Sequence, residues 1–207
     1  MGLGQKKPQK TIKITVTAVA QNPDELGKEL YSRFTAGDER AFEEIVALYR
    51  ADLTRFLYSI VNDRFEAEDL MIDTFASLAE GQRFKGESSL KTYLFAIGRH
   101  HALRCLKKRK QKNHLSIEEI LDEPLSKDDN PEADFLREDS KRRLLEGIKK
   151  LKPEYSEILR LLYFEEMSYA SAALVMNKKI KQIDNLAYNA KLALKATLES
   201  ESFSYED

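Results

Sequence analysis

The chain has 207 residues, which is enough for one large domain or two small ones. It is 42% hydrophobic and 33% charged with only 8 Gly and 5 Pro, so it can form a packed core but has too few turn formers for an all-β sandwich. The absence of a run of 18 apolar residues argues against a membrane span, and the single Cys105 excludes an internal disulfide, as is typical of cytoplasmic proteins.

The net charge of −1 averages over a chain that contains two basic segments and one acidic segment. Residues 99–112 contain seven Lys or Arg and no acid, and residues 116–140 contain ten acids and two basic residues. Residues 141–198 contain twelve basic residues and six acids. The pattern predicts two basic bodies flanking an acidic connector, and such segregation concerns binding partners rather than the fold.

The first 23 residues are basic and then alternate in hydrophobicity, with Ile12, Ile14 and Val16 separated by Lys and Thr. Such alternation is typical of a β-strand, but one isolated strand cannot bury its apolar face. We therefore expect residues 1–23 to form a flexible basic arm.

Beyond the arm, apolar residues recur at three- and four-residue spacing, which is the period of an amphipathic helix. Asp38 is expected to cap a long helix that stops near Asn62, and a second helix is expected over residues 66–80. A loop with two glycines then precedes a third helix, which starts near Ser88 or Ser89 and continues into the basic run.

The acidic connector, residues 115–139, contains two prolines and little periodicity, so we expect a solvated, flexible linker. Helical periodicity then resumes, with Pro153 at the start of one helix. Ser168 is expected to cap a short helix through about Met176, and a last helix covers roughly residues 179–198. The predicted fold class is all-α, with two small helical domains joined by the linker.

The last two helices have the proportions of a helix-turn-helix. The turn places basic and amide side chains at the N-terminal end of the second helix, namely Lys178, Lys179, Lys181, Gln182 and Asn185. In DNA-binding proteins this end of the helix enters the major groove, where such side chains contact bases and phosphates. An ordinary antiparallel helix pair with a solvated lysine cluster explains the same spacing.

The basic run follows aromatic residues at Phe84, Tyr93 and Phe95. Aromatic rings beside a cationic groove suit single-stranded nucleic acid, because bases stack on the rings while Lys and Arg follow the backbone. The alternative is that Tyr93 belongs to the core and the cations only solvate a helix end.

Two clusters are candidates for chemistry, and neither supports it. The four possible zinc ligands are His100, His101, Cys105 and His114, but most of them lie in a cationic segment that would repel a dication. The acidic pair Asp69 and Asp73 shares a helix face but has no neighbouring nucleophile or phosphate loop. We therefore expect no metal, no cofactor and no enzymatic activity. We interpret the acidic pair as a docking face for a basic partner or as ordinary solvated side chains.

Two stretches resemble regions 2 and 4 of bacterial sigma factors of the extracytoplasmic-function group. The first is DERAFEEIVALYRADLTRFLYSIVNDRFEAEDLMIDTFASL followed by FKGESSLKTYLFAIGRHHALRCLKKRK, and the second is LLEGIKKLKPEYSEILRLLYFEEMSYASAALVMNKKIKQIDNLAYNAKLALKATL. With the linker between them they span about residues 27–198 in the family's order. The resemblance implies a transcription initiation factor that binds core RNA polymerase and directs it to promoters, and that has no enzymatic activity of its own.

The resemblance also implies boundaries and roles. It implies region 2 over 24–114 and region 4 over 140–200, followed by an acidic tail at 201–207. The residues implied for docking on core polymerase are Asp69, Leu70, Asp73 and Phe75. Those implied for the −10 element are Arg83, Phe84, Lys85, Tyr93, Arg99, Lys107, Lys108 and Arg109. Those implied for the −35 element are Lys178, Lys179, Lys181, Gln182 and Asn185.

The chain departs from the family pattern at several positions. These are Ile72 for the usual Gln, Tyr93 for Trp, His100 and Arg104 for Asn and Asp, Ala170–Ala173 for a Glu-Glu-Ile-Ala stretch, and Asn189 for Arg. The implied partners are core polymerase, duplex −35 DNA, single-stranded −10 DNA and an anti-sigma factor, for a cytoplasmic chain that is monomeric when free. A free-standing helix-turn-helix regulator and a degenerate paralogue that sequesters polymerase remain as alternatives.

Overall fold

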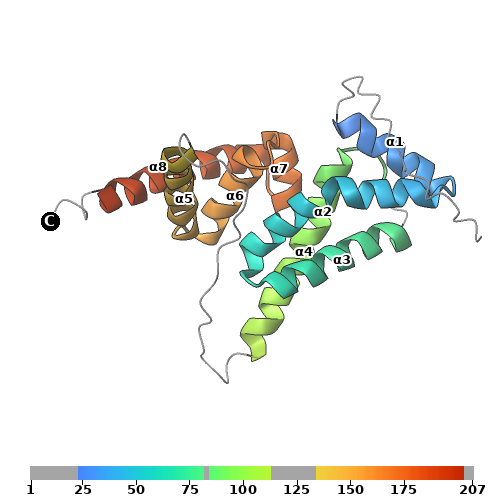
Figure 1. Ribbon diagram of the computed structural model, residues 1–207, viewed down its shortest axis with the longest axis horizontal. Coiled ribbons are helices and arrows are strands. Elements are labelled where there is room, and N and C mark those ends of the chain that lie inside the picture. The colour runs from blue at the N-terminus through green and yellow to red at the C-terminus, as the bar shows by residue number, and fades with distance from the viewer. Residues whose placement is uncertain (1–22, 82–83, 113–133, 203–207) are drawn as a thin grey trace, which may run out of the picture.

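The structure, a computed structural model, describes residues 23–81, 84–112 and 134–202. Within these residues the chain forms eight helices and no strand, which confirms the all-α prediction (Figure 1). The helices are α1 (Pro23–Thr35), α2 (Glu39–Val61), α3 (Arg64–Gly81), α4 (Leu90–Lys112), α5 (Asp134–Lys149), α6 (Pro153–Tyr163), α7 (Tyr169–Met176) and α8 (Ile180–Ser202). Residues 1–22 of the predicted arm and residues 113–133 of the predicted linker lie outside the described residues, and α5 begins inside the segment predicted as linker.

The helix ends follow from local capping chemistry. The Asp38 side chain accepts a hydrogen bond from the backbone N–H of Arg40 at 3.1 Å, which satisfies a free donor at the start of α2. Ser168 caps α7 in the same way. At the C-terminal ends of α2 and α7, Asn62 and Asn177 adopt left-handed conformations with φ of 55° and 51°. The predicted caps are therefore confirmed.

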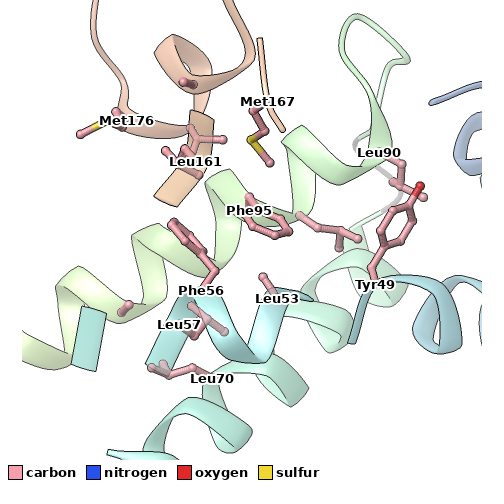
Figure 2. Close-up of a cluster of buried hydrophobic side chains, with 14 of the residues drawn as sticks. Tyr49, Leu53, Phe56, Leu57, Leu70, Leu90, Phe95, Leu161, Met167 and Met176 are labelled. Atoms are coloured by element: carbon pink, nitrogen blue, oxygen red, sulfur yellow. The ribbon is translucent and has the colours of Figure 1, made fainter. Parts of the chain in front are cut away.

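The N-terminal bundle, α1–α4, is built around α2, which packs against the other three helices. Its apolar stripe includes Leu53, Phe56 and Leu57, all at most 1% exposed (Figure 2). Burial of each such side chain stabilises the fold by about 1.5–3 kcal/mol. Gly98 lets α4 approach closely, because a Cβ there would lie 3.1 Å from Leu53 Cδ1 and 3.3 Å from Thr74 Oγ1.

The C-terminal bundle, α5–α8, is organised around α8, which packs against α5, α6 and α7. Residues at the spacing of one helix face, Ile183, Ala187 and Ala190, are fully buried along α8. The two bundles are in contact, since α7 packs on α4 and α6 packs on α2. In the view of Figure 2, Leu161 and Met167 of the C-terminal bundle lie above α4, and Phe95 lies between Met167 and Leu53.

Candidate nucleic-acid interface

Helix α3 separates the four predicted docking residues onto two faces. Asp69 and Asp73 are exposed, whereas Leu70 and Phe75 are only 7% and 5% exposed and belong to the bundle core. The Phe75 ring meets Phe42 of α2 edge-on, with centroids 6.4 Å apart. Only the two carboxylates are therefore displayed to a partner, and the two apolar side chains hold the helix in place.

Two large apolar side chains share the exposed face of α3 and were not predicted as site residues. Phe65 is 79% exposed and Ile72 is 58% exposed. Their spacing from Asp69, four residues before and three after, puts all three on one side of the helix. The sequence does indicate them, because both are large hydrophobic residues at positions that the helical period places on the solvent side of the helix. The result is a mixed acidic and apolar surface.

The loop between α3 and α4 is anchored by an aromatic cluster. The Phe84 ring is half-buried and lies between Tyr31 and Tyr93, with both centroid distances 5.2 Å. Lys28 Nζ of α1 donates a hydrogen bond to the backbone oxygen of Gly86 at 2.8 Å. Lys85 is exposed beside this anchor. Of the residues predicted here, Arg83 lies outside the described residues.

The predicted cations of α4 fall into two environments. Lys107, Lys108 and Arg109 are exposed on the last turns, and Arg109 Nη1 also donates to the backbone oxygen of Val61 at 3.4 Å. Arg99 is enclosed instead, because its guanidinium is paired with Glu157 of α6. The structure thus does not bring Arg99 together with the other three cations on one open surface.

The histidines and the cysteine of α4 have separate partners. His101 Nε2 lies 3.2 Å from Ser77 Oγ, and Cys105 Sγ donates to Glu66 Oε1 at 2.6 Å. His100 is exposed, and His114 is beyond the described residues. Within the described ranges no group of three or more His, Cys, Asp or Glu side chains is placed to hold a metal ion.

Burial and the contact with Glu66 make Cys105 a poor nucleophile. Burial and the hydrogen bond to Glu66 raise the pKa of the Cys105 thiol to about 11. Because the thiolate is the reactive form, we expect alkylation by iodoacetamide at about pH 8 to be roughly 100-fold slower in the native chain than in urea. Glu66→Gln should accelerate the native reaction severalfold. Equal native and denatured rates would show that the thiol is not held this way.

Helices α7 and α8 form the predicted helix-turn-helix. Lys178 in the turn pairs with Glu154 at 3.1 Å, and Gln182 Oε1 accepts a hydrogen bond from the backbone N–H of Lys179 at 2.8 Å. Gln182 therefore caps the start of α8 in addition to facing solvent. Lys181 and Asn185 are exposed on the next turns of the same helix.

Tyr188 extends this exposed surface and was missed by sequence reasoning. It is 62% exposed and lies three residues beyond Asn185, on the same side of α8. In the helix before the turn, Ala170 is exposed and the Ser171 hydroxyl is bonded to Ser168 at 3.0 Å. The outward surface of the helix-turn-helix therefore combines exposed residues of α7, such as Ala170 and Leu174, with those of α8.

Comparison with known proteins supports this architecture. Residues 45–112 match the family model for Sigma-70 region 2, and residues 141–194 match the model for Sigma-70, region 4, which together cover more than half of the chain. The RNA polymerase sigma factor YlaC of Bacillus subtilis is 26% identical over 76% of this chain and 92% of its own length. The ECF RNA polymerase sigma factor SigM of Bacillus subtilis is 28% identical over 74% and 93%.

The chain belongs to the sigma-70 family, in its extracytoplasmic-function group. A solved structure supports the fold: the sigma factor RpoE of Bartonella quintana, crystallised with the anti-sigma factor NepR, has a TM-score of 0.60 at 24% identity. That match covers 76% of this chain and 96% of the other. No helix in the described part of this sigma factor is long and apolar enough to cross a membrane.

The two family matches divide the surfaces of this sigma factor between them. The region 2 match contains the exposed face of α3, Phe84 and Tyr93 of the aromatic cluster, and the basic end of α4. The region 4 match contains the helix-turn-helix and most of α8. The predicted docking residues and the described −10 residues therefore lie on the N-terminal bundle, and the predicted −35 residues lie on the C-terminal bundle.

Proposed function

We propose that this sigma factor binds core RNA polymerase and directs promoter-specific initiation through three surfaces, one for each of the contacts that initiation requires. The observation that carries the proposal is the presence of both a region 2 and a region 4 match in one chain, each supplying an exposed surface of suitable chemistry. A free-standing helix-turn-helix regulator has no need of the region 2 bundle and its acidic docking face.

The docking surface consists of Asp69 and Asp73 with Phe65 and Ile72 beside them on α3. Exposed carboxylates next to large apolar side chains suit a partner that presents both cations and an apolar patch. Leu70 and Phe75 act indirectly, because they are buried and orient the helix. This surface would dock on the largest polymerase subunit, as the family resemblance implies.

The −10 surface comprises the loop at Phe84 and Lys85, with Tyr93 behind it, and the exposed cations at the end of α4. Aromatic rings can stack on an unpaired base while Lys and Arg hold the strand. Taking a base out of the duplex costs a few kcal/mol, so capture of that base couples recognition to strand opening.

Phe84→Ala is expected to leave association with core polymerase intact and to lower open-complex formation roughly tenfold, because base capture contributes about a kcal/mol or more. Permanganate footprinting of promoter melting measures the effect. The matched control is Phe34→Ala, which removes a half-buried ring of the same cluster on α1, away from the loop. Melting that is unchanged, or lowered equally by both variants, would reject a base-capture role for Phe84.

The −35 surface is the N-terminal half of α8 with the preceding turn, and it includes Lys179, Lys181, Gln182 and Asn185. The amide side chains suit adenine, and the lysines suit guanine or phosphate. Lys178 approaches the same surface while paired to Glu154.

The remaining assignments follow from this function. The chain has no catalytic role of its own, because polymerase supplies the chemistry. It acts as a monomer. It works in the cytoplasm, where polymerase and DNA are found. Region 2 extends over 24–114 and region 4 over 140–200, with the acidic segment 115–139 between them. An anti-sigma factor is the expected regulator, since the similar RpoE of Bartonella quintana is described in complex with one.

The direct test of polymerase binding is co-purification of the full chain with bacterial core polymerase on a sizing column. We expect a stable one-to-one complex that survives moderate salt. If the chain elutes separately from core polymerase at low salt, it does not bind polymerase, and a free-standing DNA-binding protein becomes the better interpretation.

A further inference from the structure

Helix α1 packs against the loop that carries Phe84, which we call the base-capture loop, residues 84–89. Tyr31 of α1 is only 7% exposed, and its ring meets the Phe84 ring edge-on with centroids 5.2 Å apart. Tyr93 of α4 contacts the same ring at the same centroid distance. Helix α1 precedes the residues that match region 2, and none of the predicted −10 residues lies on it. The structure therefore gives the loop a neighbour that has no assigned role.

A second contact from α1 holds the backbone of the base-capture loop. Lys28 Nζ donates a hydrogen bond to the carbonyl oxygen of Gly86 at 2.8 Å. Gly86 has a φ of 74°, in the left-handed region that favours glycine, so the bond fastens the chain where it bends. Lys28 precedes Tyr31 by three residues, which puts both side chains on one side of α1. One of them supports the ring of Phe84, and the other supports the backbone two residues later.

Helix α1 is fixed firmly enough to serve as a support for the loop. Leu30 is 2% exposed in the bundle core. At Gly27, an added Cβ would overlap with the Tyr49 hydroxyl oxygen and would lie 3.1 Å from Leu90 Cβ, so α1 lies in close contact with α2 and α4. Leu90 is the first residue of α4, the helix that follows the loop. The position of α1 is therefore fixed relative to the helix that ends the loop.

A cap fixes the far end of the loop. Ser89 Oγ accepts a hydrogen bond from the backbone N–H of Thr92 at 3.1 Å. The base-capture loop is thus held at Phe84, at Gly86 and at Ser89, and α1 supplies contacts at the first two positions. A binding element that is already held in its working conformation loses less entropy when the ligand binds.

We propose that α1 positions the base-capture loop, so that Lys28 and Tyr31 are positioning residues for the captured base of the −10 element. The proposal rests on the proposed function, because it takes the loop at Phe84 and Lys85 to receive an unpaired base. Neither positioning residue touches the base. They keep the Phe84 ring and the loop backbone where a stacked base needs them, so their loss weakens the hold on the base and leaves docking on polymerase unchanged.

The ring of Tyr31 carries this role, and its hydroxyl does not. The hydroxyl oxygen is buried and has no hydrogen-bond partner among the residues that the structure describes. A buried hydroxyl without a partner destabilises the fold, so Tyr31→Phe should not lower the melting temperature. Tyr31→Phe keeps the edge-on ring against Phe84, whereas Tyr31→Ala removes it. The two variants therefore separate support of the loop from the chemistry of the hydroxyl.

The test measures the hold on one base instead of the total affinity. The full chain in complex with bacterial core polymerase binds a fluorescent single-stranded oligonucleotide that carries the −10 motif found by mapping its transcript starts. A matched set of oligonucleotides replaces one base of the motif at a time by an abasic site. The position with the largest loss of affinity in the wild type is the captured base, and stacking on an aromatic ring predicts a loss of roughly tenfold there.

Lys28→Met removes the bond to Gly86 at an exposed side chain, so the fold is retained. We expect it to reduce the abasic loss from roughly tenfold to about threefold. Tyr31→Ala should reduce the same loss to about twofold, because Phe84 is then unsupported. Lys28→Arg, whose guanidinium can still donate to the carbonyl, and Tyr31→Phe should keep the wild-type loss. Affinity for the abasic oligonucleotide should stay within about twofold in every variant, since neither side chain contacts the base.

Phe34→Ala is the matched control on the same helix. The Phe34 ring packs on Phe42 of α2, with centroids 4.9 Å apart, and is not one of the rings against Phe84. This variant should keep the wild-type abasic loss. Circular dichroism verifies folding, and Lys28→Met decides the matter if Tyr31→Ala fails to fold.

A wild-type abasic loss retained in Lys28→Met, or in a folded Tyr31→Ala, would overturn the positioning role. Equal weakening of the intact and the abasic oligonucleotides would also overturn it, because that result indicates lost charge or lost fold. A wild-type chain that shows no abasic loss at any position would instead refute base capture itself. Failure of the proposed function is therefore distinguishable from failure of the role of α1.

Discussion

Replacing Asp69 and Asp73 together by arginine is expected to abolish association with core RNA polymerase while the chain stays folded. Both carboxylates are exposed on α3, so neither substitution disturbs the core. Reversal of charges that face cations replaces attraction with repulsion and costs about 3 kcal/mol or more, which is at least roughly 100-fold in affinity. Sizing-column or fluorescence titration with labelled core polymerase measures the loss.

The matched control is the double variant Glu25→Arg and Glu29→Arg. These two glutamates are also exposed and also four residues apart on one helix, but they lie on α1 rather than α3. We expect this variant to bind core polymerase within about twofold of the wild type, since changes at exposed sites outside an interface have small effects. Loss of binding in the control, or binding retained in the α3 variant, would contradict the docking assignment.

The second large effect is expected at the N-terminal half of α8. Lys181→Ala combined with Asn185→Ala removes two exposed side chains that we place against the −35 element. Each base contact contributes about 1–3 kcal/mol, so the double variant should lower transcription from a −35-dependent promoter by roughly 100-fold. Association with core polymerase should be unaffected, because the docking surface lies on α3.

Lys191→Ala combined with Lys195→Ala is the control for loss of positive charge on α8. Both lysines are exposed, but they lie two to three turns further along the helix. We expect this variant to retain most promoter activity. If both double variants reduce transcription equally, α8 contributes only general electrostatic attraction, and the −35 assignment fails.

Local chemistry explains why the helices were predictable. Asp38, Ser168 and Asn177 each cap or end a helix through bonds with residues a few positions away, and such signals are present in the sequence. Asn177 ends α7 in a left-handed conformation, and Gln182 caps the start of α8, so local chemistry separates the two helices. The all-α fold therefore follows from the helical period of the apolar residues and from the residues that cap the helices.

The faces of the site were less predictable because they depend on which side of a helix meets a neighbour. Leu70 and Phe75 belong to the segment that the family resemblance implies for docking, yet their side chains are buried against the bundle. Phe65 and Ile72 are exposed instead, against the usual preference of large apolar side chains for the core. The helical period separates the two pairs, and the packing of α3 on α2 and α4 determines which pair is buried.

The pairing of Arg99 with Glu157 was beyond sequence reasoning for a different reason. The two residues are 58 positions apart and belong to different bundles, so no local pattern connects them. The cationic run from Arg99 suggested one continuous basic surface. The structure divides it, because the C-terminal bundle packs on the first part of α4 and leaves Lys107, Lys108 and Arg109 exposed.

Run-off transcription tests whether the chain directs promoter-specific initiation. The purified chain is combined with bacterial core polymerase on fragmented genomic DNA, and the transcript starts are mapped. We predict discrete starts that share −10 and −35 motifs at a fixed spacing and that disappear with the Asp69→Arg, Asp73→Arg variant. Co-purification with core polymerase without any specific starts would show that the chain sequesters polymerase and does not direct initiation.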